Sequence, residues 1–339
     1  MSAGLARAWS KRGWVACLLW PLSLVYGVLT RLHRGLYRTG VLRTECSPVP
    51  VVVVGNVVAG GAGKTPLVIA LVQHFKQQGL QVGVVSRGYG RQGSHCLEVL
   101  ENTPISESGD EPALILRLQA APVFIANKRI HAVRALLAKY PTTQVVVSDD
   151  GLQHRSMARD IEITVFDDRG IGNGWLLPAG PLRELWGIRP GLVLHTGQSP
   201  AFEGFKSTRQ LADHALDAAG HQVALNGLNG QVITALAGIA NPEVFFDMLR
   251  ARGLQLQQTV ALPDHFDFLG YAWPVSADAV VLCTEKDAIK LFKLPQFKGY
   301  NLLAVPLEFS PEPAFLAAVD TLLTPLLAKS SELPSPYGH

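Results

Sequence analysis

The sequence predicts an α/β protein in which two sheets, built mainly from parallel strands, are flanked by helices. Three observations favour this class. Short runs rich in β-branched residues alternate with longer amphipathic segments along both halves of the chain. One such strand leads into a glycine-rich turn and a helix, and another ends in two adjacent aspartates. Ahead of all of them lies an uncharged run bordered by basic residues, which indicates a further helix at a membrane.

The N-terminal run extends from Trp14 to Thr30, and its 17 residues approach the shortest length that spans a bilayer. We predict a helix embedded in, or lying on, an anionic leaflet. A single spanning helix and a buried core helix are the alternatives. A cleaved signal peptide fits less well, because basic residues follow the run and no small-x-small cleavage site is evident. The aromatic anchors and the basic face are Trp14, Trp20, Tyr26, Arg31, Arg34 and Arg38.

The strand Val51–Val54 precedes a glycine-rich turn and a helix that opens with Lys64 and Thr65. Glycines let backbone N–H groups approach phosphate oxygens, and the helix N-terminus adds partial positive charge. Lys64 is expected to reach the β- and γ-phosphates, and the Thr65 hydroxyl to hold Mg²⁺. Val58 stands where the usual spacing has a first glycine, so an ordinary βα turn is the alternative. The loop residues expected to bind nucleotide are Gly60, Gly61, Ala62, Gly63, Lys64 and Thr65. We therefore predict a P-loop NTPase-type domain.

Two loops of this domain carry charged side chains. The first, Ser86–Arg91, follows a strand at Gln81–Val85 and suits a mobile flap over phosphates, with a solvated turn as the alternative. Its candidate ligand residues are Arg87, Tyr89 and Arg91. The second contains Asp110 and Glu111, just before a helix at Ala113, where two carboxylates can also serve simply as helix caps.

A second strong motif is the apolar strand Val145–Val147, which ends in Asp149 and Asp150. An apolar strand that ends in acidic residues is typical of a Walker B element, whose carboxylate holds Mg²⁺ directly or through water. His154 follows closely. It is expected either to orient a phosphate or a carboxylate or to make a turn hydrogen bond.

We place the domain junction in the polar stretch 198–230 and begin the second domain's strands at Val232–Ala237. In this domain His265 lies between two aspartates, and the last predicted helix is Pro311–Leu327. The predicted division is a membrane-associated segment at 1–46, a P-loop kinase domain at 47–215, a smaller C-terminal α/β domain at 216–330 and a tail at 331–339.

Composition excludes several classes of protein. With 17% charged and 48% apolar residues, the 339-residue chain is not disordered. Its four cysteines form no C-x-x-C pair, so neither a disulfide framework nor a zinc site is indicated. The net charge of +3 arises from the first 46 residues, which hold seven basic residues and one acidic residue. We therefore expect no nucleic-acid partner.

The nucleotide is expected to be ATP. A GTPase would carry Asn/Thr-Lys-x-Asp for the guanine base, and the nearest stretch, Thr284–Asp287, has its lysine one place too late.

Taken together and in order, the motifs resemble those of the tetraacyldisaccharide 4′-kinase family, the lipid A 4′-kinases of Gram-negative bacteria. The resemblance covers roughly Val15–Leu327, and the unusual glycine spacing also matches the family. The matching stretches are Gly55–Pro66, Ser86–Arg91, Gly109–Pro112, Asp149–His154, Leu177–Glu184, Asp264–Phe266 and Thr284–Ala288.

The resemblance implies ATP-dependent phosphorylation of the 4′-hydroxyl of a tetraacylated glucosamine disaccharide 1-phosphate, which gives the 1,4′-bisphosphate lipid IVA. The partners implied are this membrane lipid and the cytoplasmic face of the inner membrane, with no obligate protein partner evident. The family fold is two α/β domains joined by a β-stranded linker, with the active site between them.

The resemblance also implies residue roles. Asp110 is the candidate general base, and His265 pairs with it and orients it. Lys64 neutralises phosphate charge. Arg87, Tyr89 and Arg91 close over nucleotide or acceptor. Magnesium is expected at Thr65, Asp149 and Asp150, with Glu111 assisting.

Two other functions stay open on the sequence. One is a kinase of a soluble small molecule, with the N-terminal helix only a tether. The other is a non-enzymatic nucleotide switch recruited to the membrane.

Overall fold

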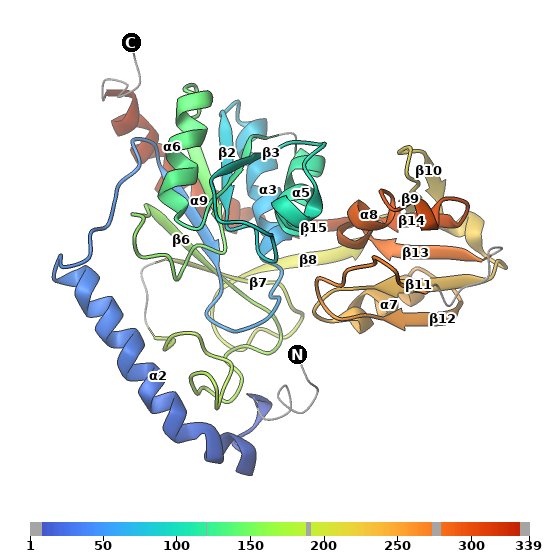
Figure 1. Cartoon of the computed structure of the whole chain (residues 1–339), viewed down its shortest axis with the longest axis horizontal. Helices are drawn as coiled ribbons and strands as arrows, with labels where there is room; N and C mark the ends of the chain where they lie inside the picture. Colours follow the sequence, from blue (N-terminus) through green and yellow to red (C-terminus); the bar gives the residue numbers. More distant parts are fainter. Residues whose placement is uncertain (1–8, 120, 188–190, 273–278, 333–339) are drawn as a thin grey trace.

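The computed structural model describes residues 9–119, 121–187, 191–272 and 279–332, and within these residues it contains two sheets (Figure 1). The larger sheet has nine strands in the order β15-β8-β7-β6-β1-β5-β2-β4-β3. All its neighbouring strands pair in parallel except the two edge pairs, β3 with β4 and β15 with β8. These strands are β1 (Val51–Gly55), β2 (Val82–Ser86), β3 (Leu97–Val99), β4 (Val123–Ile125), β5 (Val145–Asp149), β6 (Ile161–Phe166), β7 (Leu192–His195), β8 (Phe205–Leu211) and β15 (Leu307–Pro311).

Strand β1 lies in the middle of this sheet because its four valines are buried on both faces, as a central parallel strand requires. Helices α3 (Lys64–Gln77), α5 (Asp110–Gln119) and α9 (Pro313–Glu332) share one hydrophobic core on one face of the sheet. Helix α6 (Arg129–Lys139) covers the other face, and the short α4 (Ile105–Ser108) precedes α5. The register of β1 with β5 pairs Val54 with Asp149, so the glycine-rich loop and the two aspartates meet at one sheet edge.

The smaller sheet has six strands among the described residues, in the order β10-β9-β14-β13-β11-β12. Helix α7 (Pro242–Ala251) packs on one face, and α8 (Glu285–Leu291) packs on the other. The strands are β9 (His214–Leu216), β10 (Gln222–Ala224), β11 (Ile233–Ala237), β12 (Leu256–Ala261), β13 (Val280–Thr284) and β14 (Asn301–Val305). Two 3₁₀ turns, Leu225–Leu228 and Pro295–Phe297, complete this half.

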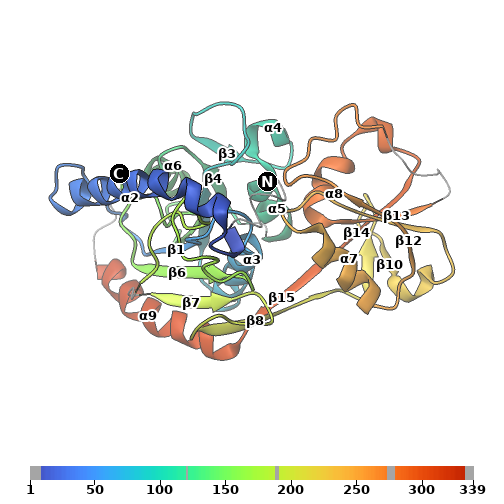
Figure 2. The same ribbon diagram turned by 90° about the horizontal axis from the view of Figure 1, so that it is seen from below.

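The chain passes from the larger to the smaller sheet through β8 and returns through β15, and these two antiparallel strands bridge the halves (Figure 1, Figure 2). After β15 the last helix, α9, packs through Phe315, Val319 and Leu323 into the core of the larger sheet. The predicted class, a parallel-dominated α/β fold in two parts, is confirmed. The division at residue 216 stays a prediction, and α9 lies with the larger sheet although the sequence assigns it to the C-terminal domain.

Helix α2 (Trp14–Arg38) is longer than the predicted run and is long and apolar enough to cross a membrane. Only Ala16, Ser23 and Gly27 are buried, and the helix lies along the outside of the fold (Figure 1). The hydroxyl of Ser23 donates to Leu176 O at 2.8 Å, and that of Tyr26 donates to Arg183 O at 2.8 Å. The outward face exposes large apolar side chains at Trp14, Leu18, Leu22, Val25, Leu29 and Leu32.

Candidate active site

The phosphate loop connects β1 to α3 and runs from Asn56 to Gly63. Gly60 and Gly63 adopt positive φ angles of 99° and 79°, a conformation that costs glycine little, and Gly63 is the N-cap of α3. Arg169 Nη2 donates to Gly61 O at 2.7 Å. A Cβ on Gly61 would lie 2.9 Å from the Cβ of Ala240, so the smaller half of the protein lies directly against the loop. The loop thus leads into the N-terminus of a 14-residue helix, as an anion site requires.

Lys64 is the first residue of α3 and is buried. Its Nζ lies 3.5 Å from Asn56 Oδ1 and 3.5 Å from Asp150 Oδ1. Arg183 Nη1 lies 3.3 Å from the same oxygen of Asp150. Burial by itself acts to raise the pKa of Asp150, but Lys64, Arg183 and Arg129 outweigh it and lower that pKa. Asp150 is therefore an ionised carboxylate beside the loop lysine.

Asp149 ends β5 and is fully buried. The Ser86 hydroxyl donates to its Oδ2 at 3.3 Å, whereas its Oδ1 has no hydrogen-bond partner among the described residues. Burial, together with the nearby carboxylates of Glu111 and Asp150, raises the pKa of Asp149 to about 7. Arg129 Nη2 donates to the backbone carbonyls of Asp149 and Asp150, each at 3.3 Å. A buried carboxylate oxygen without a partner is a position where a cation would be stabilised.

The donors present here fit a magnesium ion. Thr65, Asp149, Asp150 and Glu111 supply hydroxyl and carboxylate oxygens, which are the ligands that Mg²⁺ prefers. No cluster of three or more His, Cys, Asp or Glu side chains with metal-binding geometry occurs in the described residues. Mg²⁺ sites in phosphoryl-transfer enzymes do not need such a cage, since one or two carboxylates are completed by phosphate oxygens and water.

Asp110 begins α5, and its carboxylate is 3% exposed. His265, from the loop after β12, places Nδ1 at 2.8 Å and 2.9 Å from the two carboxylate oxygens. The N–H of Glu111 donates to Asp110 Oδ1 at 3.0 Å. The hydrogen bond with Asp110 raises the pKa of His265. For Asp110, burial acts to raise the pKa, yet His265, Lys286 and Lys290 lower it well below its usual range.

His265 itself is held in an uncommon conformation. Its φ is 61°, and among the described residues only one other non-glycine residue, Asp150 with a φ of 47°, has a positive φ. Such left-handed conformations persist where surrounding contacts determine them and often occur at functional sites. The two non-glycine residues with positive φ therefore both lie among the candidate site residues.

The three candidate residues of the loop Ser86–Arg91 have different surroundings. The ring of Tyr89 lies 5.1 Å from that of His265, centroid to centroid. Arg91 donates to His95 O at 2.8 Å, and two of its guanidinium nitrogens are buried without a partner among the described residues. Arg87 is exposed. Burial, Arg129 and Arg87 lower the pKa of His154 to about 4, so a group of cations surrounds this histidine.

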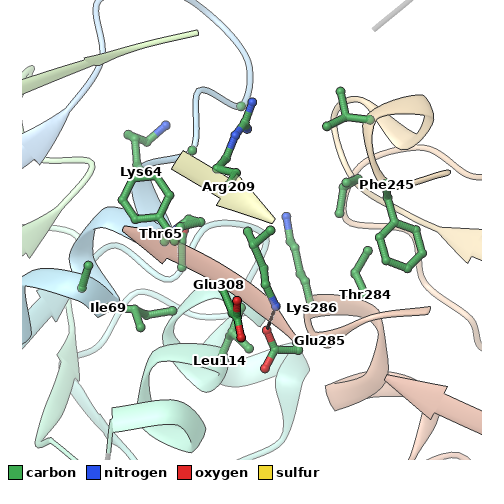
Figure 3. Close-up of a pocket in the computed structure, with 18 of the residues that line it drawn as sticks. Lys64, Thr65, Ile69, Leu114, Arg209, Phe245, Thr284, Glu285, Lys286 and Glu308 are labelled. Atoms are coloured by element: carbon green, nitrogen blue, oxygen red, sulfur yellow. Dashed lines mark hydrogen bonds between the residues drawn. The ribbon is translucent and has the colours of Figure 1, made fainter. Parts of the chain in front are cut away.

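A cavity of about 1200 Å³ lies between the halves, bounded by the loop, α3, α5, β8, β15 and α7. Lys64 and Thr65 lie on one side and Phe245 on the other, with Lys286 between them (Figure 3). Glu111 and Asp264 also line it, but Asp110 and His265 do not. The cavity thus reaches the phosphate loop and borders the Asp110–His265 pair.

Sequence reasoning named no role for four residues that the structure brings into this site. They are Arg129, Arg183, Lys286 and Lys290. The last two follow β13 on α8, in the stretch that begins at Thr284. For Lys286 a signal was available, namely a cation in the first turn of a helix that follows a buried strand, because helices that follow parallel strands start at the sheet edge where ligands bind.

Comparison with known proteins agrees with this architecture. A model of the tetraacyldisaccharide-1-P 4′-kinase family matches residues 15–324. The chain is 64% identical to the tetraacyldisaccharide 4′-kinase of Polaromonas naphthalenivorans (strain CJ2), over 100% of this chain and 99% of that protein. It is 53% identical to the enzyme of that name from Acidovorax ebreus (strain TPSY), over 95% of each chain.

The fold is also similar to a solved structure. The crystal structure of LpxK from Aquifex aeolicus in complex with ATP superimposes with a TM-score of 0.78 and 28% sequence identity. The match covers 92% of this chain and 99% of the other.

Proposed function

The chain belongs to the tetraacyldisaccharide 4′-kinase family, and we propose that it transfers the γ-phosphate of ATP to the 4′-hydroxyl of a tetraacylated glucosamine disaccharide 1-phosphate. The product would be the 1,4′-bisphosphate lipid IVA. The observation that carries the residue assignment is the pairing of Asp110 with His265 across the two halves of the protein, beside the cavity that Lys64 and Thr65 line.

ATP is supported as the donor by the ATP complex of the Aquifex relative. We assign the phosphates to the loop Gly60–Thr65, where backbone N–H groups and the α3 N-terminus favour negative charge. Lys64 neutralises charge on the transferring phosphoryl group. Mg²⁺, when bound by Thr65, Asp149 and Asp150, with Glu111 nearby, would supply charge neutralisation on the phosphates.

In the transfer step, the 4′-oxygen forms a bond to the γ-phosphorus, and the bond from phosphorus to the bridging oxygen breaks. ADP leaves with that electron pair. The Asp110 carboxylate accepts the hydroxyl proton. Its lowered pKa means that it is ionised before the transfer begins. A carboxylate accepts the substrate hydroxyl proton in protein kinases as well. Most of the rate of phosphoryl transfer comes from alignment and charge stabilisation.

We assign the acceptor's own phosphate to the cations around His154. Arg87 and Arg129 both lower the pKa of that histidine, and Arg91 and Arg129 have buried guanidinium nitrogens without partners among the described residues. Unpartnered buried donors of this kind are costly unless an anion occupies the site.

The membrane lipid is proposed to reach the site along α2. One side of this helix is bonded to the protein through Ser23 and Tyr26, so it lies against the fold while its other side exposes apolar side chains. Arg31, Arg34 and Arg38 are exposed at its end. We therefore favour an interfacial helix over a spanning one, on the cytoplasmic face where anionic lipids attract basic residues.

The test is transfer of labelled γ-phosphate from ATP to the lipid disaccharide 1-phosphate, resolved by thin-layer chromatography. A labelled lipid product is expected, and Asp110→Asn should prevent its formation. Equal activity on a deacylated, water-soluble acceptor would support a small-molecule kinase instead. ATP turnover that lipid does not stimulate, without any labelled lipid, would support a nucleotide switch.

A further inference from the structure

Two lysines of α8 converge on the carboxylate of Asp110. Lys290 Nζ lies 3.1 Å from Asp110 Oδ2, and Lys286 Nζ lies 3.7 Å from the same oxygen. Their side chains are 13% and 14% exposed, so both ammonium groups are largely removed from water. Helix α8 belongs to the smaller sheet and α5, which carries Asp110, to the larger one. These ion pairs therefore connect the two halves of the protein.

Lys286 contacts more than one carboxylate. Its Nζ lies 2.9 Å from Asp264 Oδ1 and 3.9 Å from Glu111 Oε1. Asp264 directly precedes His265, and Glu111 directly follows Asp110. Three carboxylates from both halves thus face one ammonium group. Without it, the two partly exposed carboxylates of Glu111 and Asp264 would repel the buried carboxylate of Asp110, and separation of the two halves would be favoured.

Lys290 holds the histidine loop as well as the aspartate. Its Nζ donates to the backbone carbonyl of Phe266 at 3.1 Å, one residue after His265. The same ammonium group therefore fixes the backbone beside His265 and the carboxylate that His265 contacts. Because Lys290 Nζ contacts both Phe266 O and Asp110 Oδ2, it helps to set the distance between His265 and Asp110.

We propose that Lys286 and Lys290 are positioning residues for phosphoryl transfer, which orient the Asp110 carboxylate toward His265 and hold α8 against α5. This inference rests on the proposed role of Asp110. The two oxygens of Asp110 are divided between partners. Oδ1 accepts from the Glu111 N–H, and Oδ2 faces both lysines, so the plane of the carboxylate is set by contacts on each side.

Another role for Lys286 would follow from its place in the cavity that Lys64 and Thr65 also line. A lysine there could bind the phosphates of ATP directly. The two roles predict different kinetics, because a nucleotide contact made equally in the ground and transition states changes KM, whereas misplacement of a reacting group changes kcat.

The experiment compares Lys286→Met and Lys290→Met with the matched control Lys293→Met. Lys293 donates to Glu101 O across the same boundary but contacts no carboxylate of the site. For each α8 variant we expect kcat to fall by about 10- to 100-fold, as for a misplaced catalytic group, with KM for ATP within about twofold. Lys290→Arg should recover most of the activity. The control should retain wild-type kcat.

Wild-type kcat in folded Lys286→Met and Lys290→Met proteins would overturn the inference, as would a raised KM for ATP with unchanged kcat. Thermal unfolding establishes that each variant is folded. If a methionine variant does not fold, the glutamine variant, which keeps a donor without charge, provides the same comparison. Asp110→Asn distinguishes failure of the proposed role of Asp110 from failure of the positioning role of the lysines. If Asp110→Asn retains wild-type kcat, the role of Asp110 is wrong. If Asp110→Asn is inactive while the lysine variants have wild-type kcat, only the positioning role is wrong.

Discussion

His265 Nδ1 lies 2.8 Å from Oδ1 of Asp110 although 155 positions separate the two residues in the chain. Asp110 begins a helix of the larger sheet, and His265 belongs to a loop of the smaller sheet. Their contact exists only while the halves joined by β8 and β15 lie together. It therefore couples the chemistry assigned to Asp110 to the arrangement of the two sheets.

The first prediction concerns Lys64. Lys64→Ala should leave the fold intact and lower kcat by about 100-fold or more, because one lost donor at developing charge costs about that much. Lys64 also pairs with Asp150, so Lys64→Arg tests whether charge alone suffices. Steady-state transfer assays and circular dichroism provide the measurements. Unchanged kcat in a folded variant would contradict the phosphate-loop assignment.

The second prediction concerns membrane association. Deletion of Met1–Arg12 should be tolerated better than deletion through Arg38, since the longer deletion removes α2. Because that deletion also removes the bonds made by Ser23 and Tyr26, the sharper variant replaces Arg31, Arg34 and Arg38 by Gln. At roughly 1 kcal/mol per basic residue, partitioning onto anionic vesicles should fall by about 100-fold.

Vesicle co-sedimentation measures this effect, and neutral phosphatidylcholine vesicles provide the control, on which the triple variant should bind as wild type does. Equal binding of both proteins to anionic vesicles would contradict an electrostatic role for these arginines.

The third prediction links α2 to the active site. Tyr26 donates to the carbonyl of Arg183, whose guanidinium contacts Asp150. Tyr26→Phe removes that hydrogen bond and should reduce kcat several-fold without changing vesicle binding, because it leaves the exposed apolar face unchanged. The exposed Trp14 gives the converse control: Trp14→Ala should weaken vesicle binding and leave kcat in detergent unchanged. If Tyr26→Phe keeps wild-type kcat, α2 serves only as an anchor.

The sequence predicted the central elements well, because they depend on local patterns. Four consecutive β-branched valines favour a strand buried on both faces, and this strand is observed. The motif residues predicted the family, which the comparisons confirm. Strand β8 was not predicted, because most of its residues are polar and only its last residue is buried. Its sequence is Phe-Lys-Ser-Thr-Arg-Gln-Leu. Lys286 and Lys290 gained no role because their partners come from the other sheet, and no local pattern encodes that distance.

The fourth prediction is a pH dependence of stability. Burial acts to raise the pKa of Asp110, but His265, Lys286 and Lys290 lower it below its unfolded value of about 3.9. A lowered folded pKa contributes stability above the unfolded pKa, and this stability is lost as the pH falls toward the folded pKa. The raised pKa of His265 also depends on Asp110 and adds stability as the pH falls through the range where the histidine is protonated. The difference in unfolding free energy between wild type and Asp110→Asn should therefore grow from pH 8 to about 6, as His265 is protonated, and shrink below about 4, as Asp110 is protonated.

Urea unfolding at a series of pH values measures this difference. The exposed Asp267 offers the control, since Asp267→Asn should show a smaller and flatter difference. A difference for Asp110 that continues to grow below about pH 4 would mean that the carboxylate is not stabilised in its ionised form.

The last prediction is that Asp110 and His265 act as one unit. Asp110→Asn and His265→Ala should each reduce kcat far more than they raise KM for ATP, because Asp110 accepts the hydroxyl proton, His265 orients Asp110, and neither lines the cavity beside Lys64. The double variant should then be little worse than the worse single variant, since partners in one catalytic step are not additive. If the two losses multiply, the residues act separately, and His265 binds the acceptor instead of orienting Asp110. If Asp110→Asn lowers stability and spares kcat, Asp110 is only the first residue of α5. The observed geometry favours the coupled outcome, because the imidazole of His265 contacts both carboxylate oxygens of Asp110, which is almost completely buried.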